Sequence, residues 1–489
     1  MATTFGCRKA VQSGFSLKKH VRLFRIWAGI LYLAVLSAFG IDAALVRPGS
    51  PSSPWKQYAF PEEAGFDAAR LVKARALAES SGSTAVMVVQ EGKVLAAWGD
   101  VSRRIELHSA RKSLVSALVG IYAEEGKIRL DKTVGEMGID DLVPLTAAEK
   151  KARLTDLMMS KSGIYHPAAK ETADAKASRP VRGSHSPGEF FWYNNWDFNT
   201  VGAILEKEAG IKLFDAFKKR LADPVGMEDF RVSEGYEQYE RKLSRFPAHA
   251  FRMSARDLAR FGQVFADGGR AGESRVVPAA WFKESTSPMT PVRPGTAYGY
   301  MWWVYPKGGL GADYPELNLY DKFAAIGSGG QLILVVPEAG FVFVHLADTD
   351  YAAGVGGKAV WGIAEAILAS RTGPAKPSPS FIDLRPEPFA KSFPPRREWI
   401  EVPIDRKTLE AYVGEYVLSA GSKLVIRLYG GRLAGEMMGQ EIDLFPESET
   451  RFFAKAAEVE VVFVKNDRGT VTGLSFTYGG RAEIASKSK

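Results

Sequence analysis

The stretch Leu107-His-Ser-Ala-Arg-Lys-Ser-Leu-Val-Ser-Ala-Leu-Val-Gly120 places a serine directly before a run with helical periodicity. Apolar residues recur on one face of this run, namely Leu114, Val115, Leu118, Val119 and Tyr122. Ser109 is therefore predicted at the first turn of a buried helix, with Lys112 on the same face three residues later. A helix N-terminus also offers free N–H groups to a developing oxyanion. A serine beside an amine at such a turn is one known arrangement for an activated hydroxyl nucleophile.

Ser-x-x-Lys alone is a weak pattern, because most such serines cap helices or lie on solvated faces. It occurs four times in this chain, at Ser16/Lys19, Ser53/Lys56, Ser109/Lys112 and Ser486/Lys489. The occurrence at Ser109 is the one that opens a helix with an apolar face. A second signal is therefore needed before the pattern indicates catalysis.

The first 44 residues have the composition of an export signal. Six basic residues and no acidic residue precede Asp42, and the uncharged run Ile26–Ile41 is short for a membrane span. We predict that residues 1–44 are a signal peptide or an N-terminal anchor, and that the protein is exported to the periplasm or secreted. Residues 1–40 carry six of the eight net positive charges, so no nucleic-acid partner is expected. They also hold the only cysteine, Cys7, which excludes disulfides from the rest of the chain.

The pattern of strands and helices predicts an α+β domain over residues 45–372. A hairpin covers Thr84–Trp98, three strands are expected near 320–326, 331–336 and 341–346, and a helix follows at 359–370. Short connections make these strands antiparallel neighbours, so one sheet takes strands from both ends of the domain. Residues 373–400 are predicted to be a Pro-rich linker. Residues 401–489 alternate short strands with glycine turns, which predicts a small all-β barrel or sandwich.

The second signal is the aromatic stretch Phe191–Asn199, which contains the only Tyr-x-Asn of the chain, Tyr193-Asn-Asn195. Alone, it would indicate an aromatic turn before a helix. Several other enzyme classes are excluded because their motifs are missing, including Gly-x-Ser-x-Gly, His-Glu-x-x-His, the P-loop and the dinucleotide fingerprint. The six histidines have no ligand spacing to one another, so the sequence indicates no histidine metal site.

Taken in order, Ser109-Ala-Arg-Lys112, Tyr193-Asn-Asn195 and a Gly-rich strand pair resemble the serine β-lactamase/penicillin-binding-protein superfamily. The chain is most similar to its class C branch, which includes esterases, D-aminopeptidases and 6-aminohexanoate-dimer hydrolases. The resemblance covers about residues 60–370. It implies an antiparallel sheet flanked by helices, with a helical subdomain. The C-terminal segment resembles the lipocalin-like barrels that follow such domains in some relatives.

This resemblance implies acyl transfer without a metal or cofactor. Ser109 would attack a carbonyl, and Lys112 and Tyr193 would share the removal of its proton. Asn195 would orient Lys112 and a substrate amide.

The third family motif, Lys-Thr-Gly, falls on Lys322-Phe323-Ala324 when residues are counted back without gaps from Gly330. Lys322 would then help to stabilise the Tyr193 phenolate, and the N–H of Ala325 would join that of Ser109 in the oxyanion hole.

The family uses this strand to hold the carboxylate of a β-lactam or peptide. Phe323 in place of threonine favours an ester or amide without that carboxylate. Tyr165, Trp196 and Phe323 are candidate substrate-binding residues. The expected partner is a small ester, amide or peptide-like molecule, with membrane contact only through an N-terminal anchor. The alternatives are a true β-lactamase, a D-amino-acid or peptide amidase, and a non-catalytic sensor of cell-wall fragments.

Overall fold

The computed structural model describes residues 54–489 except 396, 399, 419–420, 479–480 and 489. The signal peptide or anchor predicted for residues 1–44 lies outside this part of the chain. None of the described helices has both the length and the hydropathy that a transmembrane span requires.

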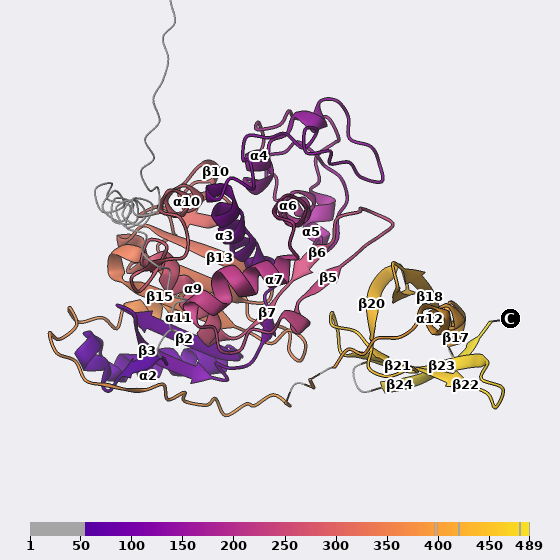
Figure 1. Cartoon of the computed structure of the whole chain (residues 1–489). Helices are drawn as coiled ribbons and strands as arrows, with labels where there is room; N and C mark the ends of the chain where they lie inside the picture. The colour runs from indigo at the N-terminus through magenta and orange to yellow at the C-terminus, as the bar shows by residue number, and fades with distance from the viewer. Residues whose placement is uncertain (1–53, 396, 399, 419–420, 479–480, 489) are drawn as a thin grey trace, which may run out of the picture. The chain divides into compact units, whose positions relative to one another are not determined.

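The N-terminal domain is built on a sheet in which ten described strands pair side by side (Figure 1). In spatial order these are β10 (Thr290–Arg293), β11 (Thr296–Tyr298), β12 (Trp303–Tyr305), β13 (Lys322–Gly327), β14 (Gln331–Val336), β15 (Phe341–Leu346), β2 (Ala85–Gln90), β3 (Lys93–Gly99), β1 (Lys56–Tyr58) and β16 (Phe381–Asp383). All neighbours are antiparallel except β1 and β3. Because β15 pairs with β2, the sheet joins strands from both ends of the domain, as predicted.

The strand β16 lies within the segment that was expected to be a linker. It pairs antiparallel with β1, from Lys56 opposite Asp383 to Tyr58 opposite Phe381. This strand was not predicted, because β16 is only three residues long, is exposed and lies in a Pro-rich segment. Residues 381–383 therefore belong to the edge of the main sheet.

Both faces of the central strands are buried. On β14, Ile333 and Val335 face one hydrophobic core, whereas Leu332 and Leu334 face another. Helices α2 (Ala68–Ser80) and α11 (Gly357–Leu368) cover the second face, and α3 (Arg111–Glu124), α9 (Ala255–Ala266) and α10 (Ala279–Ser285) cover the first. Helices on both faces explain why these strands are continuously apolar.

Helix α3 is buried on every side from Arg111 to Tyr122, not only on the apolar face that its periodicity predicts. It packs against β13 of the sheet and against α6, α7 and α10. The remaining helices of this domain are α4 (Leu154–Met158), α5 (Ala173–Ala177), α6 (Asn195–Ala209), α7 (Leu213–Phe217) and α8 (Asp223–Val225). Three two-stranded ribbons complete it: β4 (Ile105–Glu106) with β7 (Arg252–Met253), β5 (Tyr236–Gln238) with β6 (Ala248–Ala250), and β8 (Arg270–Ala271) with β9 (Ser274–Arg275).

The C-terminal segment folds into a closed antiparallel barrel, which confirms the prediction of a small barrel. After helix α12 (Arg406–Tyr412) its strands are β17 (Gly414–Leu418), β18 (Lys423–Tyr429), β19 (Arg432–Met437), β20 (Gln440–Pro446), β21 (Arg451–Phe453), β22 (Val459–Lys465), β23 (Val471–Tyr478) and β24 (Arg481–Lys487). Pairing of β17 with β24 closes the ring. Its core includes Tyr412, whose ring stacks on Phe463 at 4.0 Å.

Candidate active site

Ser109 lies in the turn that leads into α3. A single 3-10 turn, His108–Ala110, connects the strand β4 to this helix, and the Ser109 side chain stays partly exposed there. His108 has a φ of +48°, a left-handed conformation that is uncommon for a residue with a side chain. The prediction that Ser109 begins the helix is therefore correct to within one turn.

The structure brings Ser109, Lys112, Tyr193 and Asn195 together. The Lys112 Nζ lies 2.8 Å from the Ser109 Oγ, 2.8 Å from the Tyr193 hydroxyl and 2.9 Å from the Asn195 Oδ1. Asn195 is the first residue of α6, and Asn194, just before it, caps that helix by accepting from the Trp196 N–H. Two helix starts, those of α3 and α6, thus meet at the Lys112 amine.

Lys112 is buried, with 2% of its surface exposed. Burial lowers the pKa of its ammonium well below the usual value, and the nearby positive charges of Arg111 and Lys170 lower it further. Tyr193 behaves in the opposite way, because burial raises the pKa of its phenol to about 12. Both shifts favour the uncharged form of the side chain, so Lys112 is the better proton acceptor of the two.

The two positive charges near Lys112, those of Arg111 and Lys170, were not predicted from the sequence as parts of the site. Arg111 is buried and donates from Nη2 to the Asn199 Oδ1 at 3.2 Å. Lys170 forms an ion pair with Glu106, and its backbone carbonyl accepts a hydrogen bond from Asn195. Arg111 stands inside the Ser-Ala-Arg-Lys motif, whereas no pattern indicated Lys170.

Lys322 does not reach this group. It lies on β13 next to Phe323, and alternation along a strand turns it to the opposite face, the one that carries Ala324 in the core beneath α11. Its Nζ donates to the Tyr320 carbonyl at 2.9 Å, and burial lowers its pKa to about 8. The expected help of Lys322 to the Tyr193 phenolate is therefore wrong.

Strand β13 comes closest to the turn that carries Ser109 (Leu107–Ala110, the serine turn) at Gly327, two residues beyond Ala325. A Cβ on Gly327 would lie 2.2 Å from the Leu107 carbonyl oxygen and 3.1 Å from the Ala110 nitrogen. Ala325 instead packs in the core between the sheet and α3. The gapless count placed Ala325 beside Ser109, whereas the part of β13 that approaches the serine turn is its end at Gly327.

Phe323 is a core residue and not a substrate contact. It is 5% exposed, and its ring meets those of Phe265, Phe282 and Trp302 at 5.2 to 6.3 Å. These rings belong to α9, α10 and the segment before β12. The apolar side chain at this position therefore fills the core between the sheet and its helices.

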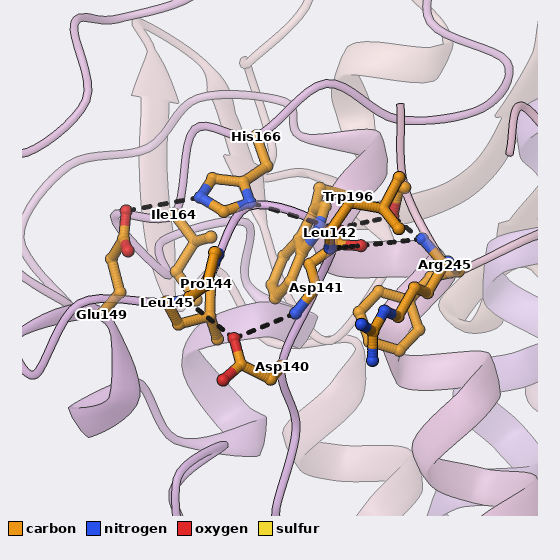
Figure 2. A network of polar contacts seen from close by, with 12 residues as sticks. Asp140, Asp141, Leu142, Pro144, Leu145, Glu149, Ile164, His166, Trp196 and Arg245 are labelled. Atoms are coloured by element: carbon orange, nitrogen blue, oxygen red, sulfur yellow. Dashed lines mark hydrogen bonds and ion pairs between the residues drawn. The ribbon is translucent and has the colours of Figure 1, made fainter. Parts of the chain in front are cut away.

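Trp196 is also structural. It is fully buried, and its Nε1 donates to the Asp141 Oδ2 at 2.7 Å (Figure 2). Figure 2 shows His166 between Asp141 and Glu149, 4.0 Å and 3.8 Å from their carboxylates. The network fixes the start of α6, and so the position of Asn195. The prediction of a substrate contact for Trp196 is wrong because no surface of its side chain is exposed.

Tyr165 lies in a separate aromatic group. Its hydroxyl lies 3.2 Å from the His185 Nδ1, and its ring meets Trp192 edge to face at 5.7 Å. The side chain is 5% exposed. No contact with Ser109 or Lys112 is found for it within the described residues.

Different aromatic residues surround Tyr193. Trp303 stacks on its ring at 5.6 Å, Tyr298 meets it edge to face at 6.2 Å, and Phe191 contacts both of these rings. Phe191 and Trp303 are only partly buried, so the aromatic group around the Tyr193 ring keeps some exposed apolar surface. Phe191 belongs to the aromatic stretch Phe191–Asn199 noted in the sequence, but aromatic content did not distinguish such residues from core positions.

Two family profiles and one curated protein match parts of this chain. The profile of the Beta-lactamase family matches residues 68–367, and that of a domain of unknown function, DUF3471, matches residues 400–487. Penicillin-binding protein 4* of Bacillus subtilis (strain 168) is 23% identical over 351 residues, which cover 64% of this chain and 70% of that protein.

Among solved structures, the octameric penicillin-binding protein homologue from Pyrococcus abyssi is 17% identical, with a TM-score of 0.47. The similarity covers 86% of this chain and all of that one. A class C beta-lactamase is also 17% identical, with a TM-score of 0.46, and covers 62% of this chain and 96% of its own.

Proposed function

Because the chain belongs to the Beta-lactamase family, whose profile spans residues 68–367, we propose that it is a serine hydrolase. It cleaves a small ester or amide through an acyl-enzyme on Ser109. The observation that carries this proposal is the buried Lys112 amine, 2.8 Å from both the Ser109 Oγ and the Tyr193 hydroxyl. A solvated lysine would be charged and inert, whereas a desolvated one is a base.

In the acylation step, neutral Lys112 accepts the proton of the Ser109 hydroxyl as its Oγ bonds to the substrate carbonyl carbon. The resulting oxyanion is held by backbone N–H groups of the serine turn and of the end of β13 beside Gly327, which the close approach of these segments allows. One such donor contributes about 3 to 4 kcal/mol to the lowering of the barrier.

Collapse of the intermediate breaks the bond to the alcohol or amine, which takes the proton from Lys112 directly or through the Tyr193 hydroxyl. Tyr193 suits this relay because its raised pKa keeps it protonated. In the second half, a water molecule gives its proton to Lys112 and attacks the acyl carbon. Breaking the bond to Ser109 then releases the acid, and the serine oxygen regains its proton from Lys112.

Two features support an ester or simple amide as substrate. The ammonium of Lys322 faces the other side of the sheet, so it does not meet a substrate carboxylate at the serine. The partly buried rings of Phe191 and Trp303 beside Tyr193 suit an apolar acyl or alcohol group. We further propose that the protein is exported, in keeping with its N-terminal segment, and that it acts in the periplasm or outside the cell.

A fluorophosphonate probe tests the nucleophile. The wild-type protein should gain the mass of one phosphonyl group, and Ser109→Ala should gain none. Ser102→Ala is the matched control, because Ser102 lies on the same approach to α3 but is exposed. Equal labelling of Ser109→Ala and the wild type would disprove the assignment.

The substrate class is tested by comparing kcat/KM for p-nitrophenyl butyrate, nitrocefin and a D-amino-acid amide. We expect the ester to be the best substrate. A higher value for nitrocefin would favour a β-lactamase, and a higher value for the amide would favour a D-aminopeptidase or oligoamide hydrolase. Binding of cell-wall fragments with no turnover of any of the three would favour a sensor.

A further inference from the structure

Three potential metal ligands meet near the C-terminal end of α6, at the opposite end of this helix from Asn195. Glu206 comes from α6, Glu237 from β5 and His249 from β6. One ligand atom from each lies within 4.8 Å of the other two. We propose that Glu206, Glu237 and His249 form a zinc site, which is separate from the serine site and independent of the hydrolase proposal.

His249 is the strongest indication of a ligand. Its side chain is 98% buried, and its ring faces the Glu206 carboxylate. Its Nε2 lies 3.7 Å from the Glu206 Oε1, beyond hydrogen-bond distance. A metal ion bound between these two atoms would coordinate both of them.

The backbone is shaped to hold this imidazole. A Cβ on Gly202 would lie 2.5 Å from the His249 Nδ1, so only glycine lets the ring lie flat against α6. Gly202 lies one helical turn before Glu206 on α6. The ring that packs against Gly202 therefore has its Nε2 side toward the Glu206 carboxylate.

Glu237 is placed by the register of the ribbon, because it lies directly opposite His249 in the pairing of β5 with β6. Both carboxylates are fixed by neighbours. The Tyr239 hydroxyl donates to the Glu237 Oε2 at 2.7 Å, and the Leu213 N–H donates to the Glu206 Oε1 at 2.9 Å. Such outer hydrogen bonds orient ligands in known metal sites.

The group faces a cavity of about 540 Å³, lined in part by all three residues, which leaves room for water as a fourth ligand. Lys212 also lines it, with its Nζ 2.8 Å from the Glu206 Oε2 and 3.5 Å from the Glu237 Oε1. Its side chain is 68% exposed and is therefore free to turn toward solvent. The Lys212 ammonium thus lies between the two carboxylates, in the position that the metal ion would take.

One imidazole nitrogen and two carboxylates match zinc. Zn²⁺ accepts both donor types at about 2.0 to 2.2 Å, whereas Mg²⁺ and Ca²⁺ prefer oxygen ligands alone. Tetrahedral ligands at this distance lie about 3.3 to 3.5 Å apart, so the three atoms must move closer by an ångström or so. Two carboxylates also neutralise the charge of the ion.

Calorimetric titration of the metal-free protein with ZnCl₂ at pH 7 tests the site. We expect one Zn²⁺ per chain, and binding at least about tenfold weaker in Glu237→Gln and His249→Ala. Glu208→Gln is the matched control, because Glu208 lies on the same helix and pairs with Lys132 outside the group. It should bind Zn²⁺ as the wild type does. No saturable binding by the wild type, or unchanged binding by Glu237→Gln, would overturn the proposal.

A melting experiment gives a second readout that does not depend on activity. Zn²⁺ that binds only the folded protein raises its Tm. The rise should appear in the wild type and in Glu208→Gln, and should be absent from Glu237→Gln, which keeps the shape of the side chain. If His249→Ala does not fold, Glu237→Gln decides the question. An equal rise in all variants would show binding elsewhere and would refute the site.

Discussion

Replacing Lys112 by methionine separates its chemical role from its structural cost. The substitution keeps the length of a buried side chain but removes the amine that contacts Ser109, Tyr193 and Asn195. Loss of a general base lowers the rate by about 10² to 10⁴, equivalent to about 2.7 to 5.4 kcal/mol in the barrier. We expect kcat/KM for p-nitrophenyl butyrate to fall by this factor.

The same substitution has two opposing effects on stability. The buried Asn195 Oδ1 loses a partner, which costs about 1 to 3 kcal/mol. The wild-type fold, however, holds Lys112 below its normal pKa, so the unfolded chain binds more protons and the amine destabilises the fold near neutral pH. Methionine removes that cost. We therefore expect a Tm at pH 7 close to or above that of the wild type.

The pH dependence gives the sharpest form of this prediction. Between the lowered pKa of Lys112 and the unfolded value of about 10.4, the amine makes wild-type stability rise with pH. The free energy of unfolding of the wild type should gain up to about 1.36 kcal/mol per pH unit relative to Lys112→Met. Urea unfolding of both proteins at pH 7, 8 and 9 measures the difference. Parallel pH profiles would mean that Lys112 titrates normally and would refute the general-base mechanism.

Four further substitutions test the site. Arg111→Met removes a buried positive charge beside Lys112, so its pKa should rise and the acid limb of the kcat/KM profile should move to higher pH. Gly327→Ala puts a Cβ 2.2 Å from a carbonyl of the serine turn and should lower kcat/KM for the ester at least about tenfold, the effect of one lost oxyanion donor. Lys322→Met should change ester kcat/KM by less than about twofold, because its ammonium faces away from Ser109. A tenfold loss would mean that Lys322 takes part in the site. Trp196→Phe loses a buried hydrogen bond to a carboxylate, so unfolding in urea should show a loss of about 1.5 to 3 kcal/mol with an unchanged KM.

Local patterns were enough to predict much of this fold. The hairpin near residues 84–98 and the strands at 331–336 and 341–346 are confirmed, because short connections and apolar runs depend on neighbouring residues only. The position of Ser109 with Lys112 follows from helix geometry for the same reason. Pairing of β16 with β1 joins residues more than 300 positions apart, and no local pattern indicates it.

The error on β13 has a physical cause. Alternation of polar and apolar residues assigns the faces of a strand only when one face meets solvent. Here both faces are buried, and a buried lysine with its Nζ on the Tyr320 carbonyl fits an apolar strand without exposing its charge. The steric requirement at Gly327 was the informative feature, since only a residue without Cβ allows the serine turn to approach.

The choice of base depends on information that no motif contains. Ser-x-x-Lys and Tyr-x-Asn place an amine and a phenol beside a hydroxyl, and leave both as proton acceptors. Burial lowers the pKa of the amine and raises that of the phenol, because desolvation penalises whichever form is charged. With Lys322 on the other face of the sheet, the phenolate loses the cation that was expected to stabilise it. Meanwhile Arg111 and Lys170 add to the lowering of the lysine pKa, and the second of these charges comes from a loop far along the chain. The same three-dimensional arrangement therefore keeps Tyr193 protonated and favours the unprotonated form of Lys112, which can accept a proton.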